Sequence, residues 1–298
     1  MTFIEVLQGS QPLTIILVTV LGLLTGSFLN VVIHRVPIML QRDWQQQCCE
    51  FLERSAESLK LTDPVPDHKV FNLANPPSHC PGCNKPIRPW QNVPVVSYIL
   101  LKGKCAGCKT PIHWRYPTVE IATALLSGLV AWRFGATPAC LAALILTWIL
   151  ISLTMIDLDH QLLPDNMTMP LLWLGLALSV TPYGIGTTAQ EAVLGAVFGY
   201  LSLWSVYWTF RLLTGREGMG FGDFKLLAAL GAWLGWQSLL GIIILSSLAG
   251  AVIGIALIIL AGRDKNRPMP FGPCLATAGF IALIWGPQLN QWYLSVLT

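Results

Sequence analysis

Two aspartates lie at the ends of hydrophobic runs, where carboxyl groups can perform acid–base chemistry at a membrane surface. Asp157 directly follows an apolar run, and Asp223 completes a Gly-x-Gly-Asp motif that begins at Gly220. When one carboxyl is ionised and the other is protonated, the first takes a proton from water and the second donates one to a carbonyl oxygen or a leaving nitrogen. Close approach of two like charges in a poorly solvated site splits their ionisation in this way. The two residues are therefore a candidate pair for peptide hydrolysis.

Each acidic residue near these positions also has a structural alternative. Asp223 and Asp165 stand where helices are expected to begin, so either could serve as an N-cap. Asp159 could be a solvated charge at the end of a helix. Asp157 is the hardest of the four to explain structurally, because it lies at the edge of an apolar run. Spacing alone leaves both the catalytic pair and the structural roles open.

Four cysteines form two short repeats whose spacing suits a metal ion. Cys80 and Cys83 enclose Pro-Gly, Cys105 and Cys108 enclose Ala-Gly, and each pair continues into Pro-Ile after two further residues. Two Cys-x-x-Cys pairs supply the four thiolates of a tetrahedral zinc site, and the glycines let backbone amides face the sulfurs. Disulfides are the alternative, which a reducing compartment disfavours. The adjacent cysteines 48 and 49 have no partner at ligand spacing and are predicted to pack against neighbours.

Composition places the chain in a membrane. The 298 residues are 54% hydrophobic and only 11% charged, with a mean hydropathy of +0.60. Apolar runs of roughly 20 residues match the thickness of a bilayer. We expect an all-α polytopic membrane protein with about eight transmembrane helices, near residues 13–33, 117–132, 139–156, 167–180, 192–213, 224–234, 239–261 and 275–297. The run after Asp223 is short and could be re-entrant.

The basic residues predict the orientation of the chain. No Lys or Arg precedes the first run, so this run is expected to remain as an anchor with its N-terminus outside. Of the 18 basic residues, all except Arg133 fall in three segments: 35–115, 211–225 and 263–267. The positive-inside rule puts such segments in the cytoplasm. The cysteine repeats, Asp157 and Asp223 are then all predicted on the cytoplasmic side.

The expected division of the chain has three parts. Residues 1–36 form the first transmembrane helix, residues 37–115 a cytoplasmic zinc-binding domain, and residues 116–298 a membrane aspartic peptidase domain. The first part of the cytoplasmic segment is predicted to form an amphipathic surface helix, because apolar residues recur there near helical spacing: Trp44, Cys48, Phe51, Leu52 and Leu59. In the first membrane helix, Gly26, Ser27 and Asn30 are typical of close packing against a partner helix.

Several unrelated motifs in this order resemble the type IV prepilin peptidases, the bifunctional leader peptidases and N-methyltransferases of the bacterial inner membrane. The resemblance covers nearly the whole chain. It is carried by Gly26-Ser27-Phe28-Leu29-Asn30-Val31-Val32-Ile33-His34-Arg35, both cysteine repeats, Arg115-Tyr116-Pro117 with Glu120, Asp157 with Leu163-Pro164-Asp165, the motif ending at Asp223, and Pro270-Phe271-Gly272-Pro273.

The resemblance implies an activity, a substrate and cofactors. It implies that Asp157 and Asp223 are the catalytic pair, cutting the leader of type IV prepilins and type II secretion pseudopilins after a glycine at the cytoplasmic membrane face. The new N-terminal residue, usually phenylalanine, is then methylated with S-adenosylmethionine. The cysteine loop, with its zinc, is associated with methylation. The bilayer and precursor proteins are the implied partners, and nucleic acid is not one.

Two points remain open in the sequence. No glycine-rich Rossmann fingerprint is present, so the S-adenosylmethionine site is not predicted. Glu120 and Glu217 are possible contacts to cationic groups, with pairing to a neighbouring arginine the favoured alternative. A proton-coupled transporter with a zinc-bound cytoplasmic cap is the competing function. Such a transporter would place ionisable groups near the midplane and often show repeated spans, and neither pattern is found.

Overall fold

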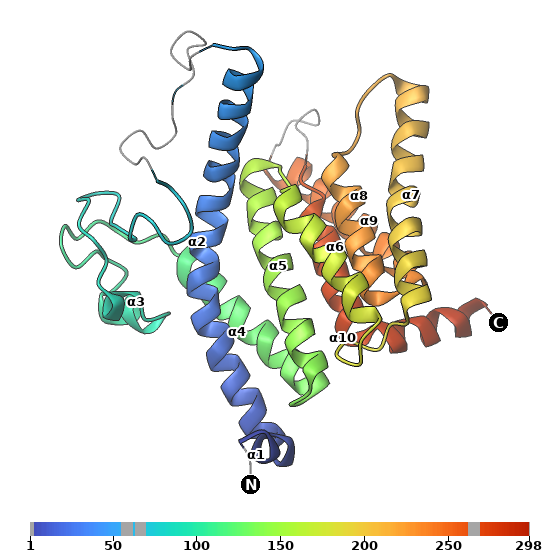
Figure 1. Cartoon of the computed structure of the whole chain (residues 1–298), viewed down its shortest axis with the longest axis horizontal. Helices are drawn as coiled ribbons and strands as arrows, with labels where there is room; N and C mark the ends of the chain where they lie inside the picture. The colour runs from blue at the N-terminus through green and yellow to red at the C-terminus, as the bar shows by residue number, and fades with distance from the viewer. Residues whose placement is uncertain (1–2, 55–61, 63–69, 262–268, 298) are drawn as a thin grey trace. The chain divides into compact units, whose positions relative to one another are not determined.

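The protein is built of helices. The computed structural model describes residues 3–54, 62, 70–261 and 269–297, and these residues contain no β-strand, only isolated bridges at His79–Pro86 and Lys104–Pro111. The helices are α1 (Phe3–Gly9), α2 (Gln11–Phe51), α3 (Val96–Leu100), α4 (Arg115–Phe134), α5 (Pro138–His160), α6 (Asp165–Ser179), α7 (Ala189–Thr214), α8 (Phe221–Leu234), α9 (Leu239–Ala261) and α10 (Gly272–Leu297), with single 3₁₀ turns at Pro89–Asn92 and Trp236–Ser238 (Figure 1). The predicted all-α class is confirmed.

Not every predicted membrane run is long enough to cross a bilayer. All eight runs lie in helices, but α6 has 15 residues and α8 has 14. At a rise of 1.5 Å per residue these helices measure about 22 and 21 Å, less than the roughly 30 Å of a hydrocarbon core. Within the described ranges, five segments have the length and composition of a span: Gln11–Phe51, Pro138–His160, Ala189–Thr214, Trp236–Leu260 and Gly272–Gln291. A multi-pass membrane protein is confirmed, whereas the count of eight crossings is not.

One face of α9 is apolar and exposed. The helix contains two serines, Ser246 and Ser247, among apolar residues and glycines, and only 17% of the most hydrophobic window of Trp236–Leu260 is buried inside the protein. The exposed residues recur at helical spacing: Leu240, Ile244, Leu248, Val252, Ile255 and Ile259. A continuous apolar stripe of this length is disfavoured in water and favoured against lipid tails.

The chain forms two compact units. One comprises Met1–Ile15 and Leu129–Thr298, and the other comprises Ile16–Gly128. The first contains α5 to α10, and the second contains most of α2 together with α3, the cysteine repeats and most of α4. The three-part division predicted from the sequence uses different criteria and stays a prediction.

In the first unit α8 is the central helix. It packs against α6, α7, α9 and α10, and Figure 1 shows α7 running alongside it. Every residue from Phe224 to Trp233 is buried except Lys225. A helix that is apolar on all sides is expected inside a protein, and this explains why so short a run is so hydrophobic.

Small residues allow α7 and α8 to cross closely. Gly195 of α7 faces Gly231 of α8 so tightly that a Cβ on either glycine would overlap the backbone of the other. On the opposite side, the Trp233 indole N–H of α8 donates a 2.8 Å hydrogen bond to the Leu171 carbonyl of α6. These contacts fix α8, and therefore its first turn, from both sides.

Most of α2, a helix of 41 residues with Pro37 inside it, belongs to the second unit. A proline inside a helix removes one backbone hydrogen bond, and α2 continues through it to Phe51. The surface helix predicted around Trp44 is thus the outer half of α2, and Leu59 lies outside the described residues.

The predicted packing role of the Gly26 region is confirmed. A Cβ on Gly26 would stand 2.8 Å from the Cα of Glu120, so α2 and α4 touch at this point. One turn further, the Asn30 amide donates a 3.2 Å hydrogen bond to the Tyr116 carbonyl of α4. The polar groups of α2 therefore meet a partner helix.

Candidate active site and metal centre

Asp157 is a buried carboxyl in the last turn of α5. The helix ends just beyond it because Gln161 adopts a left-handed conformation, with its N–H bonded to the Asp157 carbonyl at 2.9 Å. The side chain is 5% exposed, and its Oδ2 accepts a 3.0 Å hydrogen bond from the backbone N–H of Gly272. Gly272 is the first residue of α10, where backbone N–H groups lack helical partners. The carboxyl is thus held by a helix N-terminus 115 residues away.

Asp223 is a buried carboxyl in the first turn of α8. The helix begins after Gly220, which is its N-cap residue and forms no side-chain cap. Asp223 is therefore inside the helix and is not the N-cap that was one alternative. Its side chain is 7% exposed. Burial, with a contribution from the charge of Asp157, raises the pKa of Asp223 to about 7. At neutral pH a substantial fraction of this carboxyl keeps its proton.

The two carboxyls come from segments that meet around Leu163. A Cβ on Gly222, beside Asp223, would lie 2.7 Å from the Leu163 Cβ. A Cβ on Gly272 would lie 2.6 Å from the Asp157 Oδ2 and 3.1 Å from the Leu163 Cδ2. At both positions the absence of a side chain lets the neighbouring segment pack closely, and neither glycine has a positive φ angle. The charge of Asp157 contributes to the raised pKa of Asp223, as expected for two carboxyls in one poorly solvated site.

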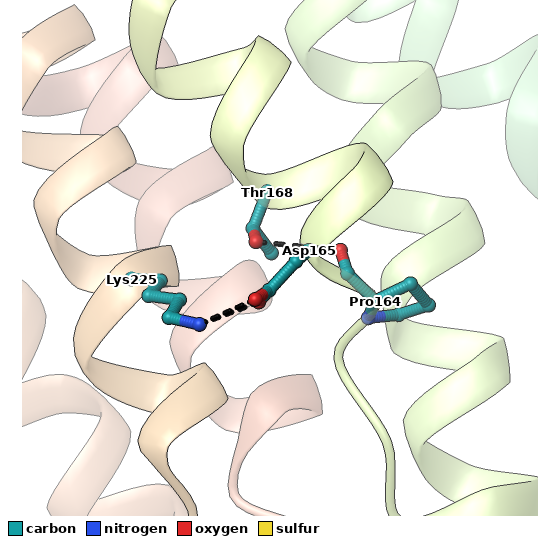
Figure 2. Close-up of polar contacts among 4 residues, drawn as sticks. All are labelled: Pro164, Asp165, Thr168 and Lys225. Carbon is teal, nitrogen blue, oxygen red and sulfur yellow. Dashed lines mark hydrogen bonds and ion pairs between the residues drawn. The ribbon is translucent and has the colours of Figure 1, made fainter. Parts of the chain in front are cut away.

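The other two aspartates have different surroundings. Asp159 is exposed at the end of α5. Asp165 is the first residue of α6, where Pro164 is the N-cap residue, so it is not an N-cap either. Its two oxygens accept hydrogen bonds of 2.7 and 2.6 Å from the Lys225 ammonium of α8 (Figure 2). The preceding carbonyl, of Pro164, accepts a 3.3 Å bond from the Thr168 hydroxyl. Asp165 therefore links α6 to α8.

The four predicted cysteine ligands come together in the second unit. The sulfurs of Cys80, Cys83, Cys105 and Cys108 all lie within 4.8 Å of one another. Cys80 and Cys108 Sγ are 3.7 Å apart, close to the roughly 3.8 Å edge of a tetrahedron with 2.3 Å zinc–sulfur bonds. All four are free thiols, so the disulfide alternative is not realised. The cluster is a candidate metal centre. Cys48 is exposed and Cys49 half-buried, so neither is a core packing residue.

The sequence repeat is also a structural repeat. In each knuckle the N–H of the first cysteine bonds to the carbonyl five residues later, and the N–H four residues after that cysteine bonds back to its carbonyl. The glycine of each knuckle lies next to a cysteine sulfur of the other knuckle. A Cβ on Gly82 would lie 3.6 Å from the Cys108 sulfur, and one on Gly107 would lie 3.6 Å from the Cys83 sulfur. Each knuckle therefore packs on the other's ligand.

The environment of the sulfurs favours bound cations. Hydrogen bonds from Thr110 lower the pKa of the Cys108 thiol to about 6, and amides of Cys108 and Gly107 lower the pKa of Cys105. At Cys83 a hydrogen bond from the Lys85 amide acts in the same direction, but burial and the neighbouring sulfurs raise its pKa to about 11. Four clustered thiols cannot all ionise without positive charge, which a divalent metal supplies.

Several functional contacts could not be read from the sequence. Glu120 is buried and bonded to the Val95 N–H at 2.8 Å, whereas the sequence favoured an arginine partner. Glu217 does pair with an arginine, Arg211, at 3.7 Å. The Gly272 amide was part of a quoted motif without a predicted role. The Asp165–Lys225 pair joins residues 60 positions apart, and no local pattern indicates it.

The fold and these sites define a multi-pass helical membrane protein with a buried acidic pair and a four-cysteine centre. Comparison with known proteins agrees in both halves of the chain. Residues 20–134 match the bacterial peptidase A24 N-terminal domain, and residues 144–255 match the type IV leader peptidase family.

Curated relatives match over the full length. Proteins named "Prepilin leader peptidase/N-methyltransferase" are 54% identical in Stutzerimonas stutzeri, covering 99% of this chain and 98% of the relative, and 54% identical in Pseudomonas aeruginosa, covering 96% of each. The Neisseria gonorrhoeae relative of the same name is 52% identical, covering 91% of this chain and 90% of its own. The chain belongs to the type IV leader peptidase family, as its motifs indicated. No solved structure matches it.

Proposed function

We propose that this protein cleaves the leader peptide of type IV prepilins and then N-methylates the new N-terminal residue. Relatives that match over at least nine-tenths of their length carry both activities in their name. The observation that carries the proposal is the pair of buried carboxyls, Asp157 and Asp223, on helix ends that meet around Leu163. The same observations favour a peptidase over the proton-coupled transporter.

In the proposed cleavage, Asp157 is the ionised member of the pair and Asp223 the protonated one. The Gly272 amide is a hydrogen-bond donor to Asp157, which suits a carboxylate, and Asp223 keeps its proton near pH 7. Asp157 takes a proton from water as the water oxygen attacks the scissile carbonyl carbon, and Asp223 protonates the carbonyl oxygen. The tetrahedral intermediate, which carries two hydroxyls on the former carbonyl carbon, then collapses. The proton on Asp157 passes to the leaving nitrogen, the carbon–nitrogen bond breaks, and one of the two hydroxyls returns its proton to Asp223 as the new carboxylic acid forms.

The metal proposed for the four-cysteine centre is zinc. A set of four thiolates with tetrahedral spacing suits this ion, and such closed sites are structural because no coordination position is left for substrate. Zinc held by Cys80, Cys83, Cys105 and Cys108 would join the two knuckles. S-adenosylmethionine is the methyl donor that the second activity calls for, since transfer to an amine needs an activated methyl group.

The proposed location is the bacterial inner membrane, with the acidic pair and the cysteine centre on the cytoplasmic side. The distribution of basic residues supports this orientation. Pseudopilin precursors of type II secretion are proposed as further substrates, and the bilayer as the surrounding partner.

Cleavage of a purified prepilin by the full-length protein in detergent tests the acidic pair. Asp157→Asn and Asp223→Asn are each expected to abolish cutting, and Asp159→Asn is the matched control because it removes an exposed carboxyl from the same helix end. Circular dichroism and elution volume establish that the variants are folded. A normal cleavage rate in either of the first two variants contradicts the proposed pair.

A further inference from the structure

The second unit contains a cavity of about 670 Å³ that none of the steps above uses. It is bounded by α2, α3, the start of α4 and both cysteine knuckles, so helices form one side and loops the other. Its volume falls within the roughly 300–1,000 Å³ typical of small-molecule sites. Its lining combines apolar and aromatic side chains with many polar ones, among them the basic residues Arg35, Lys85 and Arg88 and the acidic residue Glu120.

An acidic group is built into the helical side of this cavity. Glu120 of α4 is 8% exposed and lines the cavity. Its Oε2 accepts a 2.8 Å hydrogen bond from the Val95 N–H, and the Ser27 hydroxyl of α2 also bonds to it. Gly26 lets α2 approach the Glu120 backbone directly. Both neighbours hold the carboxyl in place without neutralising it, because neither carries a positive charge.

The backbone next to Glu120 is held in a rare conformation. Val95 has φ of 57°, a region that a β-branched residue seldom occupies, and its N–H is the donor to Glu120. Strain of this kind persists only where the surrounding structure imposes it, and it clusters at active sites and ligand sites. The carboxyl thus accepts a hydrogen bond from a residue whose backbone conformation its surroundings impose.

A buried cation lines the same cavity. Arg35 of α2 is 7% exposed and donates hydrogen bonds of 2.8 and 2.6 Å to the Asn72 and Pro76 carbonyls. The guanidinium also lies 5.5 Å from the centre of the Phe71 ring. A guanidinium has five N–H donors, and the bonds to these two carbonyls of the described residues use two of them. The cavity therefore offers a buried carboxyl, a buried guanidinium and aromatic surfaces, and the basic side chains of Lys85 and Arg88 also line it.

These features match the chemistry of one ligand that the proposed function requires. S-adenosylmethionine has a sulfonium and an ammonium at one end, a carboxylate beside the ammonium, and a flat adenine ring. A buried carboxylate attracts the cationic groups, a guanidinium binds a carboxylate, and aromatic rings such as those of Tyr98 and Tyr116 stack on a purine. Both tyrosines line the cavity.

We propose that this cavity is the S-adenosylmethionine site and that Glu120 contacts the positively charged end of the methyl donor. The inference rests on the proposed methyltransferase activity and adds to it a location and a residue.

Direct binding to the full-length protein in detergent tests the inference. Isothermal titration calorimetry with S-adenosylmethionine and with S-adenosylhomocysteine, which lacks the sulfonium charge, gives both affinity and charge preference. The unmodified protein is expected to prefer the sulfonium. Glu120→Gln is expected to weaken S-adenosylmethionine binding roughly tenfold, because the variant removes the negative charge that attracts the sulfonium and the ammonium. It is also expected to reduce the preference for the sulfonium. Glu217→Gln, at an exposed residue paired with Arg211, is the matched control and is expected to bind normally.

Prepilin cleavage by the same samples separates a binding defect from misfolding, because the acidic pair lies in the other compact unit. Photo-crosslinking of radiolabelled S-adenosylmethionine, followed by peptide mapping, does not depend on any variant. Label is expected on peptides containing Tyr98 or Tyr116. Three results each overturn the inference while leaving the proposed function standing. They are normal binding of S-adenosylmethionine by Glu120→Gln, S-adenosylmethionine label only within residues 144–255, and labelling of the cavity peptides by a crosslinkable precursor peptide but not by S-adenosylmethionine. Absence of both binding and methylation in the unmodified protein overturns the methyltransferase function itself.

Discussion

The ion pair between Asp165 and Lys225 is expected to position Asp223 without taking part in the chemistry. Lys225 follows Asp223 by two residues in the first turn of α8, and Asp165 is the first residue of α6. The ammonium contacts both carboxylate oxygens, at 2.7 and 2.6 Å. Removing the pair releases the start of α8 from α6, while the rest of α8 stays fixed by its buried contacts with α6, α7, α9 and α10.

The exposure of the pair sets the size of the effect. The Lys225 side chain is 26% exposed and the Asp165 side chain 62%, so solvent screens much of their attraction. Measured values for such pairs are about 0.2–1 kcal/mol. If the whole of this free energy acts on the transition state, it corresponds to at most roughly a fivefold change in rate. Asp165→Asn and Lys225→Met are therefore each expected to slow prepilin cleavage about two- to fivefold, in contrast to the complete loss expected for Asp223→Asn.

The assay is cleavage by purified full-length protein over a range of ionic strength. Because salt screens exposed charges, the advantage of the unmodified protein over both variants should shrink as salt rises. A double variant carrying both changes is expected to be no slower than either single variant, since both remove the same interaction. Loss of activity as complete as that of Asp223→Asn would assign a catalytic role to one of the residues. Unchanged rates at low salt would show that the pair positions nothing.

Three further predictions concern pH, metal and packing. The pKa of Asp223 is raised to about 7 from its usual value near 4, so its proton is present below neutral pH and lost above it; the cleavage rate is expected to fall as pH rises through about 7, and a rate that keeps rising to pH 9 would contradict Asp223 as the donor. Protein purified without chelator is expected to contain one zinc per chain by mass spectrometry and Cys108→Ser much less, with methylation reduced more than cleavage; an isolated loss of cleavage would reverse this assignment. The added methyl group of Gly195→Ala should overlap the Gly231 backbone and lower the free energy of unfolding, measured by denaturant titration, by about 1–3 kcal/mol. The methyl group of Gly241→Ala meets nothing within 4 Å, so this variant should unfold like the unmodified protein.

The sequence predicted those features that depend on neighbouring residues. Each knuckle is local, since its cysteines, glycine and turn lie within the eight residues 80–87 or 105–112, and the four sulfurs meet as expected. Hydrophobic runs likewise located the membrane helices. Hydropathy does not distinguish a helix that faces lipid from one that faces protein, so α8, which is buried on all sides, was counted with the spans. The sequence predicted a first membrane span near residues 13–33 and a surface helix through Trp44, whereas one continuous helix, α2, contains both.

Features that join distant segments were not predicted. The Gly272 amide reaches Asp157 across 115 residues, and Lys225 reaches Asp165 across 60. Each depends on how the helices pack, and packing is not encoded in the spacing of any one segment. The cavity around Glu120 belongs to the same class, because its walls come from three helices and two loops.

The short central helix has a consequence for how the protein is made. At about 21 Å, α8 is too short to be retained in a bilayer on its own, and it carries a carboxyl near one end. The glycine crossing with α7 offers it an immediate partner just upstream in the chain. We therefore expect the insertion machinery to release α7 and α8 as a joined hairpin, so that the aspartate never meets lipid alone during biogenesis.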